Sequence, residues 1–133
     1  MEVNLKDADI GIRTKLDPDP VVVYGDREGI VQSVLELLSN SLDNLPSGGN
    51  INIACRRERE FTGLASIDVV DDGPGIPKNL RSRIFDLFVT SKADGHGIGL
   101  ASVRRSVELH GGTVSVIPTD EEGAHIRIQL PVA

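Results

Sequence analysis

Hydrophobic residues change their spacing several times along this chain, and each change marks an expected element. Strict period-two alternation from 124 to 130 predicts a strand. One face of this strand carries Ala124, Ile126, Ile128 and Leu130. Further extended segments are expected at 10–16, 21–24, 51–57, 67–70 and 113–117. Runs rich in glycine, proline and aspartate separate several of them, as turns do.

Helical patterns are expected in three places. Asp26 is a candidate N-cap for a long helix that ends near Leu45. A short helix is expected over residues 78–85, and a third opens at a glycine-rich loop and ends at His110. Strands and helices are mixed without regular βαβ alternation. This order predicts a single α+β domain over residues 1–133: a two-layer α/β sandwich whose mixed, largely antiparallel sheet is covered on one face by helices.

The long helix has two contrasting stripes. At 100° per residue, six apolar side chains fall within about 60° of one direction and form the expected core face. They are Val31, Val34, Leu35, Leu38, Leu42 and Leu45. Glu36, Asn40 and Asp43 lie opposite, one above another. These polar residues are either a solvated surface or a site in which Asn40 offers a neutral oxygen to Mg²⁺ and Glu36 accepts a proton. Periodicity leaves both interpretations open.

Composition excludes several function classes. The 14 Lys and Arg against 20 Asp and Glu give a formal net charge of -6, which argues against a nucleic-acid partner and against contact with an anionic membrane. Cys55 is the only cysteine, so neither a disulfide framework nor a cysteine zinc site is expected. A reducing cytoplasm is the expected setting, and no run approaches the roughly 18 apolar residues of a membrane span.

Two glycine-rich turns carry candidate chemistry. In the first, Asp71 stands at a strand end before Gly73 and Gly75, where a flat ligand could meet the backbone and Asp71 could accept a hydrogen bond from an amine. The second, from Gly95 to Leu100, opens a helix, and amides at a helix start form an anion site. An ordinary turn and a flexible connection are the plain alternatives. Lys92, just upstream, is either a phosphate contact or a solvated lysine.

In order along the chain, four motifs resemble the catalytic domain of histidine kinases, in the superfamily shared with gyrase, MutL and the heat-shock chaperone ATPases. Residues 36–43 look like the N box, residues 71–76 like the first glycine box, residues 84–92 like the F box and residues 95–100 like the second glycine box. The F box favours histidine kinases over the other branches. The resemblance covers nearly the whole chain and implies the Bergerat-type ATP-binding fold.

The resemblance also implies cofactors and roles. ATP and Mg²⁺ would bind here, with Asn40 holding the metal and Glu36 acting as general base or orienting water. Asp71 would recognise the adenine amine. The rest of the nucleotide site would comprise Asp43, Gly73, Gly75, Ile76, Lys92, Gly95, His96, Gly97, Gly99 and Leu100. Phe85 and Phe88 would anchor a mobile lid.

Several positions depart from the family pattern. Asp72 stands where Asn is usual, which adds negative charge near the nucleotide, and Leu87 stands where Pro is common. Six residues separate Phe88 from Gly95, so the lid is short.

The expected partners follow from the histidines. His96, His110 and His125 do not lie in a His-Glu context on a long helix, so the phosphoacceptor histidine is expected on a separate helical domain, with relay to a response regulator. The isolated domain is expected to be a monomer. The alternatives are a serine kinase of the anti-sigma-factor type or a slow ATPase, and a non-catalytic nucleotide-binding module.

Overall fold

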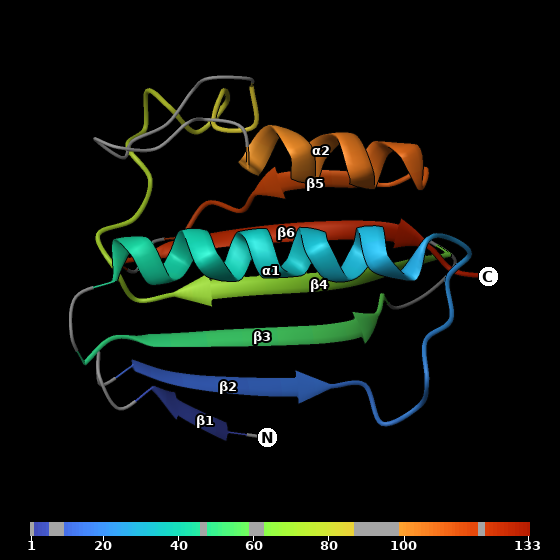
Figure 1. Ribbon diagram of the computed structural model, residues 1–133, viewed down its shortest axis with the longest axis horizontal. Helices are drawn as coiled ribbons and strands as arrows, with labels where there is room; N and C mark the ends of the chain where they lie inside the picture. The colour runs from blue at the N-terminus through green and yellow to red at the C-terminus, as the bar shows by residue number, and fades with distance from the viewer. Residues whose placement is uncertain (1, 6–9, 46–47, 59–62, 87–98, 120–121) are drawn as a thin grey trace.

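The computed structural model describes residues 2–5, 10–45, 48–58, 63–86, 99–119 and 122–133. They form two layers: a six-stranded sheet, and two helices, α1 and α2, that cover one of its faces (Figure 1). The strands are β1 (Glu2–Leu5), β2 (Ile10–Leu16), β3 (Asn50–Arg57), β4 (Leu64–Asp71), β5 (Thr113–Val116) and β6 (Ala124–Pro131). The helices are α1 (Arg27–Asn44) and α2 (Gly99–Leu109).

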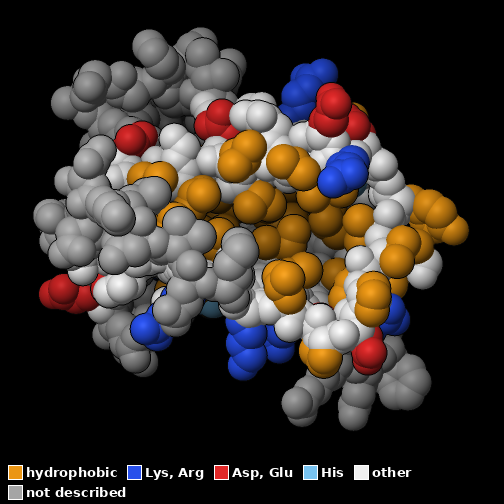
Figure 2. Space-filling model, turned by 60° about the horizontal axis from the view of Figure 1, so that its bottom comes forward, with side chains coloured by type: hydrophobic (Ala, Val, Ile, Leu, Met, Phe, Trp, Pro, Cys, Tyr) orange, Lys and Arg blue, Asp and Glu red, His pale blue; other side chains and the backbone are white. Residues whose placement is uncertain are grey.

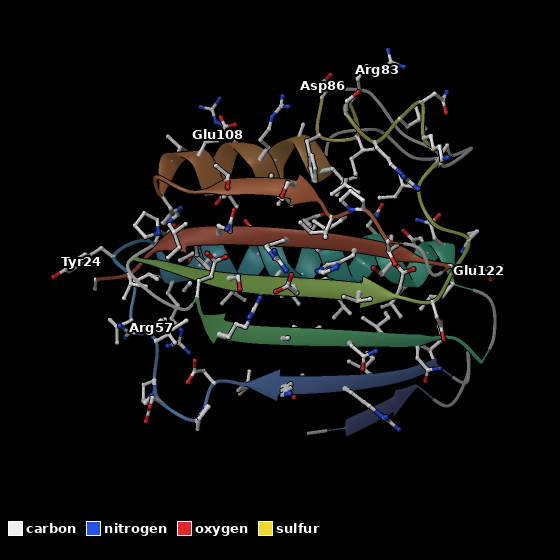
Figure 3. The ribbon with its side chains drawn as sticks, turned by 180° about the vertical axis from the view of Figure 1, so that it is seen from behind. Tyr24, Arg57, Arg83, Asp86, Glu108 and Glu122 are labelled. Atoms are coloured by element: carbon white, nitrogen blue, oxygen red, sulfur yellow. The ribbon has the colours of Figure 1, made fainter. Side chains whose placement is uncertain are left out.

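The sheet has the order β1-β2-β3-β4-β6-β5 and is antiparallel except where β2 pairs with β3. That parallel pair needs a crossover, and α1 supplies it on the helix side of the sheet. The mixed, largely antiparallel sheet covered on one face confirms the predicted fold class. Seen from behind, the other face carries side chains and no described helix (Figure 3).

Helix α1 begins and ends where local chemistry requires. The Asp26 carboxylate accepts a hydrogen bond from the Glu28 amide at 3.2 Å, which satisfies one of the free amides of the first turn. At the other end Leu45 is extended, with φ −83° and ψ 137°. The residue before a proline is pushed out of the helical region, and Pro46 follows Leu45 in the sequence. Both predicted ends are confirmed.

The predicted core face of α1 is wrong at its outer edge. Val31 and Leu35 are 48% and 49% exposed, whereas Ser33, Leu37 and Ser41 are the buried residues of this helix. Helix α1 packs against α2 and over β4, and the small serines allow a close approach. The apolar stripe is thus turned away from the centre of the core. The prediction failed here because periodicity gives the direction of an apolar stripe but does not say which elements pack against it.

Residues 78–85 do not form the expected helix. They form successive turns in which amides bond to carbonyls three residues back, from Leu80 to Pro77 and from Arg83 to Leu80, both at 2.9 Å. So short a segment gains little from helical bonds alone, because the first turn is costly to nucleate. Ile84 and Phe85 are nevertheless buried in the core, each 6% exposed.

The core lies between the helices and the sheet. Val103 and Val107 of α2 are buried, and the predicted alternation of β6 is confirmed by its buried face of Ile126, Ile128 and Leu130. Helix α2 ends as expected, with Gly111 at φ +77° after its last turn. Among the described residues, no helix combines the length and apolar character that a bilayer span needs.

Candidate functional site

A pocket opens beside the carboxyl end of β4, under the C-terminal half of α1 and next to the start of α2. Its polar lining comes from Asn40, Ser41, Asn44 and Asp71, and its remaining walls are apolar or glycine. The remaining lining residues are Val69, Gly75, Ile76, Ile84, Leu100, Ala124 and Ile126. A mostly apolar hollow with a few convergent polar groups is the usual form of a small-ligand site.

Asp71 is the only carboxylate that lines this pocket among the described residues. It is 7% exposed, and its Oδ1 accepts hydrogen bonds from the amides of Gly73 at 3.0 Å and Ala124 at 3.3 Å. In the part of the chain that the structure describes, Oδ2 accepts none. The backbone therefore fixes one oxygen and leaves the second as an acceptor for a ligand.

Glycines let the backbone close tightly around Asp71. Gly75 has φ +83°, and a Cβ there would lie 3.0 Å from the Gly123 carbonyl oxygen. Gly123 has φ +116°, and a Cβ on it would overlap the Asp71 carbonyl. A side chain at Gly73 would crowd Asp71 Oδ1 at 3.2 Å. Residues 71–75 and 123–124 thus form one compact backbone platform that only glycine permits.

The helix wall of the pocket comes from the last turns of α1. Asn40 and Asn44 are one turn apart, and Asn44 Nδ2 donates to the Asn40 carbonyl at 2.9 Å. The Asn40 side-chain amide has no partner among the described residues. It is therefore available to a ligand, with a neutral oxygen of the kind that Mg²⁺ accepts.

Glu36 lies one turn before Asn40, at the border of the pocket. Its Oε2 is so close to Gly99 that a Cβ on this glycine would lie only 2.6 Å away. Its Oε1 has a long contact of 3.5 Å with Gln32 Nε2. A carboxylate beside the first residue of α2 is electrostatically favourable, because the amides of a helix start carry partial positive charge.

Two acidic residues near the pocket do not line it. Both Asp72 oxygens face Asn50: Oδ1 accepts from its amide at 2.7 Å and Oδ2 from its side chain at 3.1 Å. The bond from the Asn50 amide, followed by that from its side chain, lowers the pKa of Asp72 below its ordinary value. Asp43 is exposed and is not among the lining residues.

The other predicted residues divide into two groups. Ile76 and Leu100 line the pocket, and Arg81 Nε holds the Ile76 carbonyl at 3.2 Å. Lys92, Gly95, His96 and Gly97 lie outside the described residues, as does Phe88.

Sequence reasoning missed several lining residues and the glycine beside them. Asn44 has a recoverable signal, since it follows Asn40 by one helical turn. Gly123 and Ala124 reach Asp71 only through the β4–β6 pairing, in which Asp71 lies opposite Ala124. No local pattern gives a pairing across more than fifty residues.

No group of three or more His, Cys, Asp or Glu suited to a metal ion occurs in the described ranges. A metal held without such a cluster depends on other ligands. Mg²⁺ fits this donor set, because it keeps several waters and takes phosphate oxygens in addition to one or two protein oxygens.

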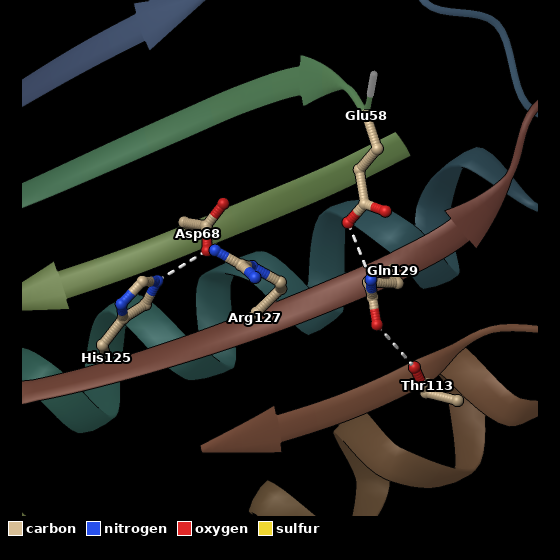
Figure 4. Close-up of polar contacts among 6 residues, drawn as sticks. All are labelled: Glu58, Asp68, Thr113, His125, Arg127 and Gln129. Atoms are coloured by element: carbon tan, nitrogen blue, oxygen red, sulfur yellow. Dashed lines mark hydrogen bonds and ion pairs between the residues drawn. The ribbon is translucent and has the colours of Figure 1, made fainter. Parts of the chain in front are cut away.

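A second polar cluster lies on the opposite face of the sheet (Figure 4). Asp68 Oδ1 is 2.6 Å from His125 Nε2 and accepts from Arg127 Nε at 2.7 Å. Burial alone would raise the pKa of Asp68, but the bonds from His125 and Arg127 outweigh it and hold the pKa below its ordinary value. Next to them, Gln129 Nε2 donates to Glu58 Oε1 at 2.7 Å.

Comparison with known proteins agrees with this geometry. Residues 25–133 match the family described as histidine kinase-, DNA gyrase B-, and HSP90-like ATPase. The chain belongs to this family. Sensor protein DivL of Caulobacter vibrioides is 35% identical over 130 residues, covering 96% of this chain and 16% of DivL. Sporulation kinase A of Bacillus subtilis is 30% identical, covering 92% of this chain and 20% of that kinase.

Solved structures agree on the fold. The mycobacterial sensor histidine kinase MprB has a TM-score of 0.82 and 31% identity, covering 96% of this chain and 86% of the solved chain. The catalytic domain of histidine kinase ThkA has a TM-score of 0.82 and 28% identity, covering 95% and 81%. This chain spans between about a sixth and a third of the length of the first curated relatives. The match is therefore to one domain of these proteins.

Proposed function

We propose that this chain binds Mg-ATP in the pocket beside Asp71 and transfers the γ-phosphoryl group to a histidine on a separate phosphoacceptor domain. The reaction would belong to two-component signal transduction, with relay to a response-regulator aspartate. The observation that carries the proposal is the Asp71 carboxylate at the edge of an apolar pocket. Among the described residues, its Oδ1 accepts two backbone hydrogen bonds, and its Oδ2 is left as an acceptor for a ligand.

Base recognition follows from Asp71 and its neighbours. The exocyclic amine of adenine donates to Asp71 Oδ2, a charge-assisted bond of about 1.5–3 kcal/mol. The flat base lies against apolar walls such as Ile84, Leu100 and Ile126. Gly75 carries no side chain, so the base edge can approach the backbone platform.

The triphosphate end depends on the two helices. Asn40 offers its side-chain oxygen to Mg²⁺, which would neutralise charge on the phosphates. Glu36, one turn earlier, would orient the attacking histidine or take its proton. The start of α2, at Gly99, lies beside Glu36, and its free amides would hold a phosphate. Asp43, Gly73, Lys92, Gly95, His96 and Gly97 are assigned to the nucleotide from the sequence motifs and their resemblance.

The relatives support the reaction class. Two curated relatives are named sensor histidine kinase TmoS and sensory histidine kinase/phosphatase NtrB. A solved structure of ShkA in complex with AMPPNP has 27% identity and a TM-score of 0.82. Another with the same fold is ThkA in complex with response regulator protein TrrA. On this basis we take residues 1–133 as one catalytic domain whose partners are a histidine-bearing domain and a response regulator. That the isolated domain is a monomer is what the family resemblance implies.

A serine kinase of the same family and a non-catalytic nucleotide-binding module are the competing functions. The pocket favours a catalytic domain, because the Asn40 side-chain amide has no partner in the described part of the chain and Glu36 lies one turn away beside α2. Incubation with ATP and a histidine-bearing helical domain separates the three. A histidine kinase gives an acid-labile phosphoprotein, a serine kinase an acid-stable one, and a binding module neither.

The first test is calorimetric titration with ATP, with and without Mg²⁺, beside Asp71→Ala. We expect the wild type to bind and the variant to bind roughly 10- to 150-fold more weakly, which corresponds to about 1.5–3 kcal/mol. Asp68→Asn, on the other face of the same strand, is the matched control and should bind like the wild type. Equal affinities for wild type and Asp71→Ala would overturn the adenine assignment.

A further inference from the structure

The nucleotide pocket has walls from two elements that are anchored to the core to different degrees. Ile84 lies in the turns that end at residue 86 and is 6% exposed, as is its neighbour Phe85, so the core holds that wall firmly. Leu100, in the first turn of α2, also lines the pocket but is only partly buried. The shape of the pocket therefore depends on where the first turns of α2 lie relative to the turns that carry Ile84.

Helix α2 makes a narrow apolar contact with the core. Val103 and Val107, one turn apart, are its buried residues, whereas Leu109 is 76% exposed. Across the face drawn in Figure 2, hydrophobic side chains likewise gather in the middle and charged ones lie toward the rim. Two valines on one line leave the helix free to roll about that line, so further contacts at its sides are needed to fix its first turns.

The C-terminal half of α2 is tied to the start of α1 by hydrogen bonds. The Asp26 amide donates to His110 Nε2 at 2.9 Å, and His110 Nδ1 lies 2.6 Å from the Ser106 carbonyl oxygen. Ser106 Oγ donates to the Gly29 carbonyl at 3.3 Å. A Cβ on Gly25 would overlap the His110 ring, so the ring lies directly against this backbone. None of these residues lines the nucleotide pocket, so this attachment leaves the pocket end of α2 to be held by another contact.

An ion pair connects the middle of α2 to the turns. Arg104 Nη1 lies 3.0 Å from Asp86 Oδ1. Arg104 follows Leu100 by four residues, so the two lie one above the other on the same side of the helix. Asp86 follows Ile84 by two residues, and its amide donates to the Arg83 carbonyl at 2.9 Å, which continues the turns. The pair therefore links the two segments that supply Leu100 and Ile84 to the pocket.

The strength of this pair limits what it can do. The side chains of Arg104 and Asp86 are 41% and 44% exposed, and solvent screens such a pair, which shifts an equilibrium by no more than about fivefold. The second contact of Arg104, from Nε to Glu108 Oε1, is longer, at 4.0 Å. A site that is correctly formed only part of the time binds in proportion to its formed fraction, so the loss of the pair can weaken nucleotide binding by about the same factor.

We infer that the Arg104–Asp86 ion pair is a clasp that holds α2 against the turns and so sets the slot for the adenine ring. Arg104 is a positioning residue, since it does not line the pocket and acts through Leu100 on its own helix. It also lies outside the four sequence motifs. The inference deepens the proposed function and rests on it, because it assumes that the pocket binds the base of ATP.

Charge reversal tests the clasp. Arg104→Asp places two carboxylates at the contact, and Arg104→Asp/Asp86→Arg restores an ion pair with its charges exchanged. Arg105→Asp is the matched control, because it makes the same change of charge at the next residue of α2, and Arg105 forms no ion pair within the described ranges. The ligands are ATP and adenosine, titrated by calorimetry. Adenosine has no phosphates, so an altered charge on α2 does not act on it at long range.

We expect Arg104→Asp to bind ATP and adenosine about two- to tenfold more weakly than the wild type, since repulsion between the two carboxylates adds to the loss of the pair. The double variant should bind both ligands like the wild type, and Arg105→Asp should leave adenosine binding unchanged. A pair that served stability alone would move the urea midpoint of Arg104→Asp and leave the adenosine affinity of the folded domain as it is.

Three results would overturn the inference: equal adenosine affinities for wild type and Arg104→Asp, a double variant as weak as the single one, or the same loss in Arg105→Asp. A wild type that binds neither ligand would instead sink the proposed function. The clasp is then tested without nucleotide, by the methyl shifts of Ile84 and Leu100 in nuclear magnetic resonance spectra. They should move in Arg104→Asp and return in the double variant, and shifts that stay in place would contradict the clasp.

Discussion

Asp68 and Asp71 lie three residues apart on β4, are 6% and 7% exposed, and face opposite sides of the sheet. Asp68 accepts from side chains of the next strand, His125 and Arg127, both at Oδ1. Asp71 also accepts twice at Oδ1, but from the backbone amides of Gly73 and Ala124. Asp71 lines the pocket and Asp68 does not. Equal burial thus has two meanings: a carboxylate paired with Arg127 and His125 on the open face stabilises the fold, and one positioned by backbone amides at a pocket wall can bind a ligand.

The largest expected difference between the two residues is in how much their substitution lowers the free energy of unfolding. Asp68→Ala leaves Arg127 and His125 without their acceptor, which costs about 3–5 kcal/mol for a fully buried pair. Their side chains are 24% and 21% exposed, so we expect about 2–3 kcal/mol here. Asp71→Asn keeps an Oδ1 for both amides and should cost less than about 1 kcal/mol. Urea unfolding of both variants measures the difference.

One result of the urea experiment would contradict this prediction. A larger loss for Asp71→Asn than for Asp68→Ala would mean that the backbone platform, and not the sheet-face cluster, is the structural element. ATP affinity should also distinguish the two residues. Under conditions in which Asp68→Ala is folded, this variant should bind ATP like the wild type.

Acid should affect the Asp68 cluster in a defined direction. The pKa of Asp68 is lowered from its ordinary 3.8, because the bonds from His125 and Arg127 outweigh the effect of burial. A lowered pKa means stability that is fully present above the ordinary value and is lost as the pH falls below it. The difference in unfolding free energy between wild type and Asp68→Asn should therefore shrink below about pH 4. A difference that stays constant from pH 6 to pH 3 would contradict this account.

Local sequence patterns predict some parts of this fold correctly and miss others. The β6 alternation, the Asp26 cap and the end of α1 are local patterns, and all three are confirmed. Leu37, which is 0% exposed at the centre of the core, was missed because the strongest apolar stripe of α1 is centred on other residues, of which Val31 and Leu35 are about half exposed. Helix α1 contacts both α2 and β4, so it has more than one buried direction, and only the tertiary arrangement says which is central.

The site shows the same limit. Asp71, Gly75 and Ile76 belong to one contiguous motif and are found from it. Ala124 and Gly123 come from the far end of the chain, and the strand pairing that brings them to Asp71 has no signature in either segment. Period two does put Asp68 and Asp71 on opposite faces, but it does not say which face the helices cover.

Asp72 extends the comparison to a third carboxylate and should show the smallest effect. Both of its oxygens face Asn50 and it is exposed, so Asp72→Asn should change the unfolding free energy by no more than about 0.5 kcal/mol. Removing one negative charge near a triphosphate should tighten ATP binding, but by no more than about twofold, because solvent and salt screen the interaction. Calorimetry at two salt concentrations measures it. A gain of about tenfold or more would mean that Asp72 turns from Asn50 toward the nucleotide when ATP binds.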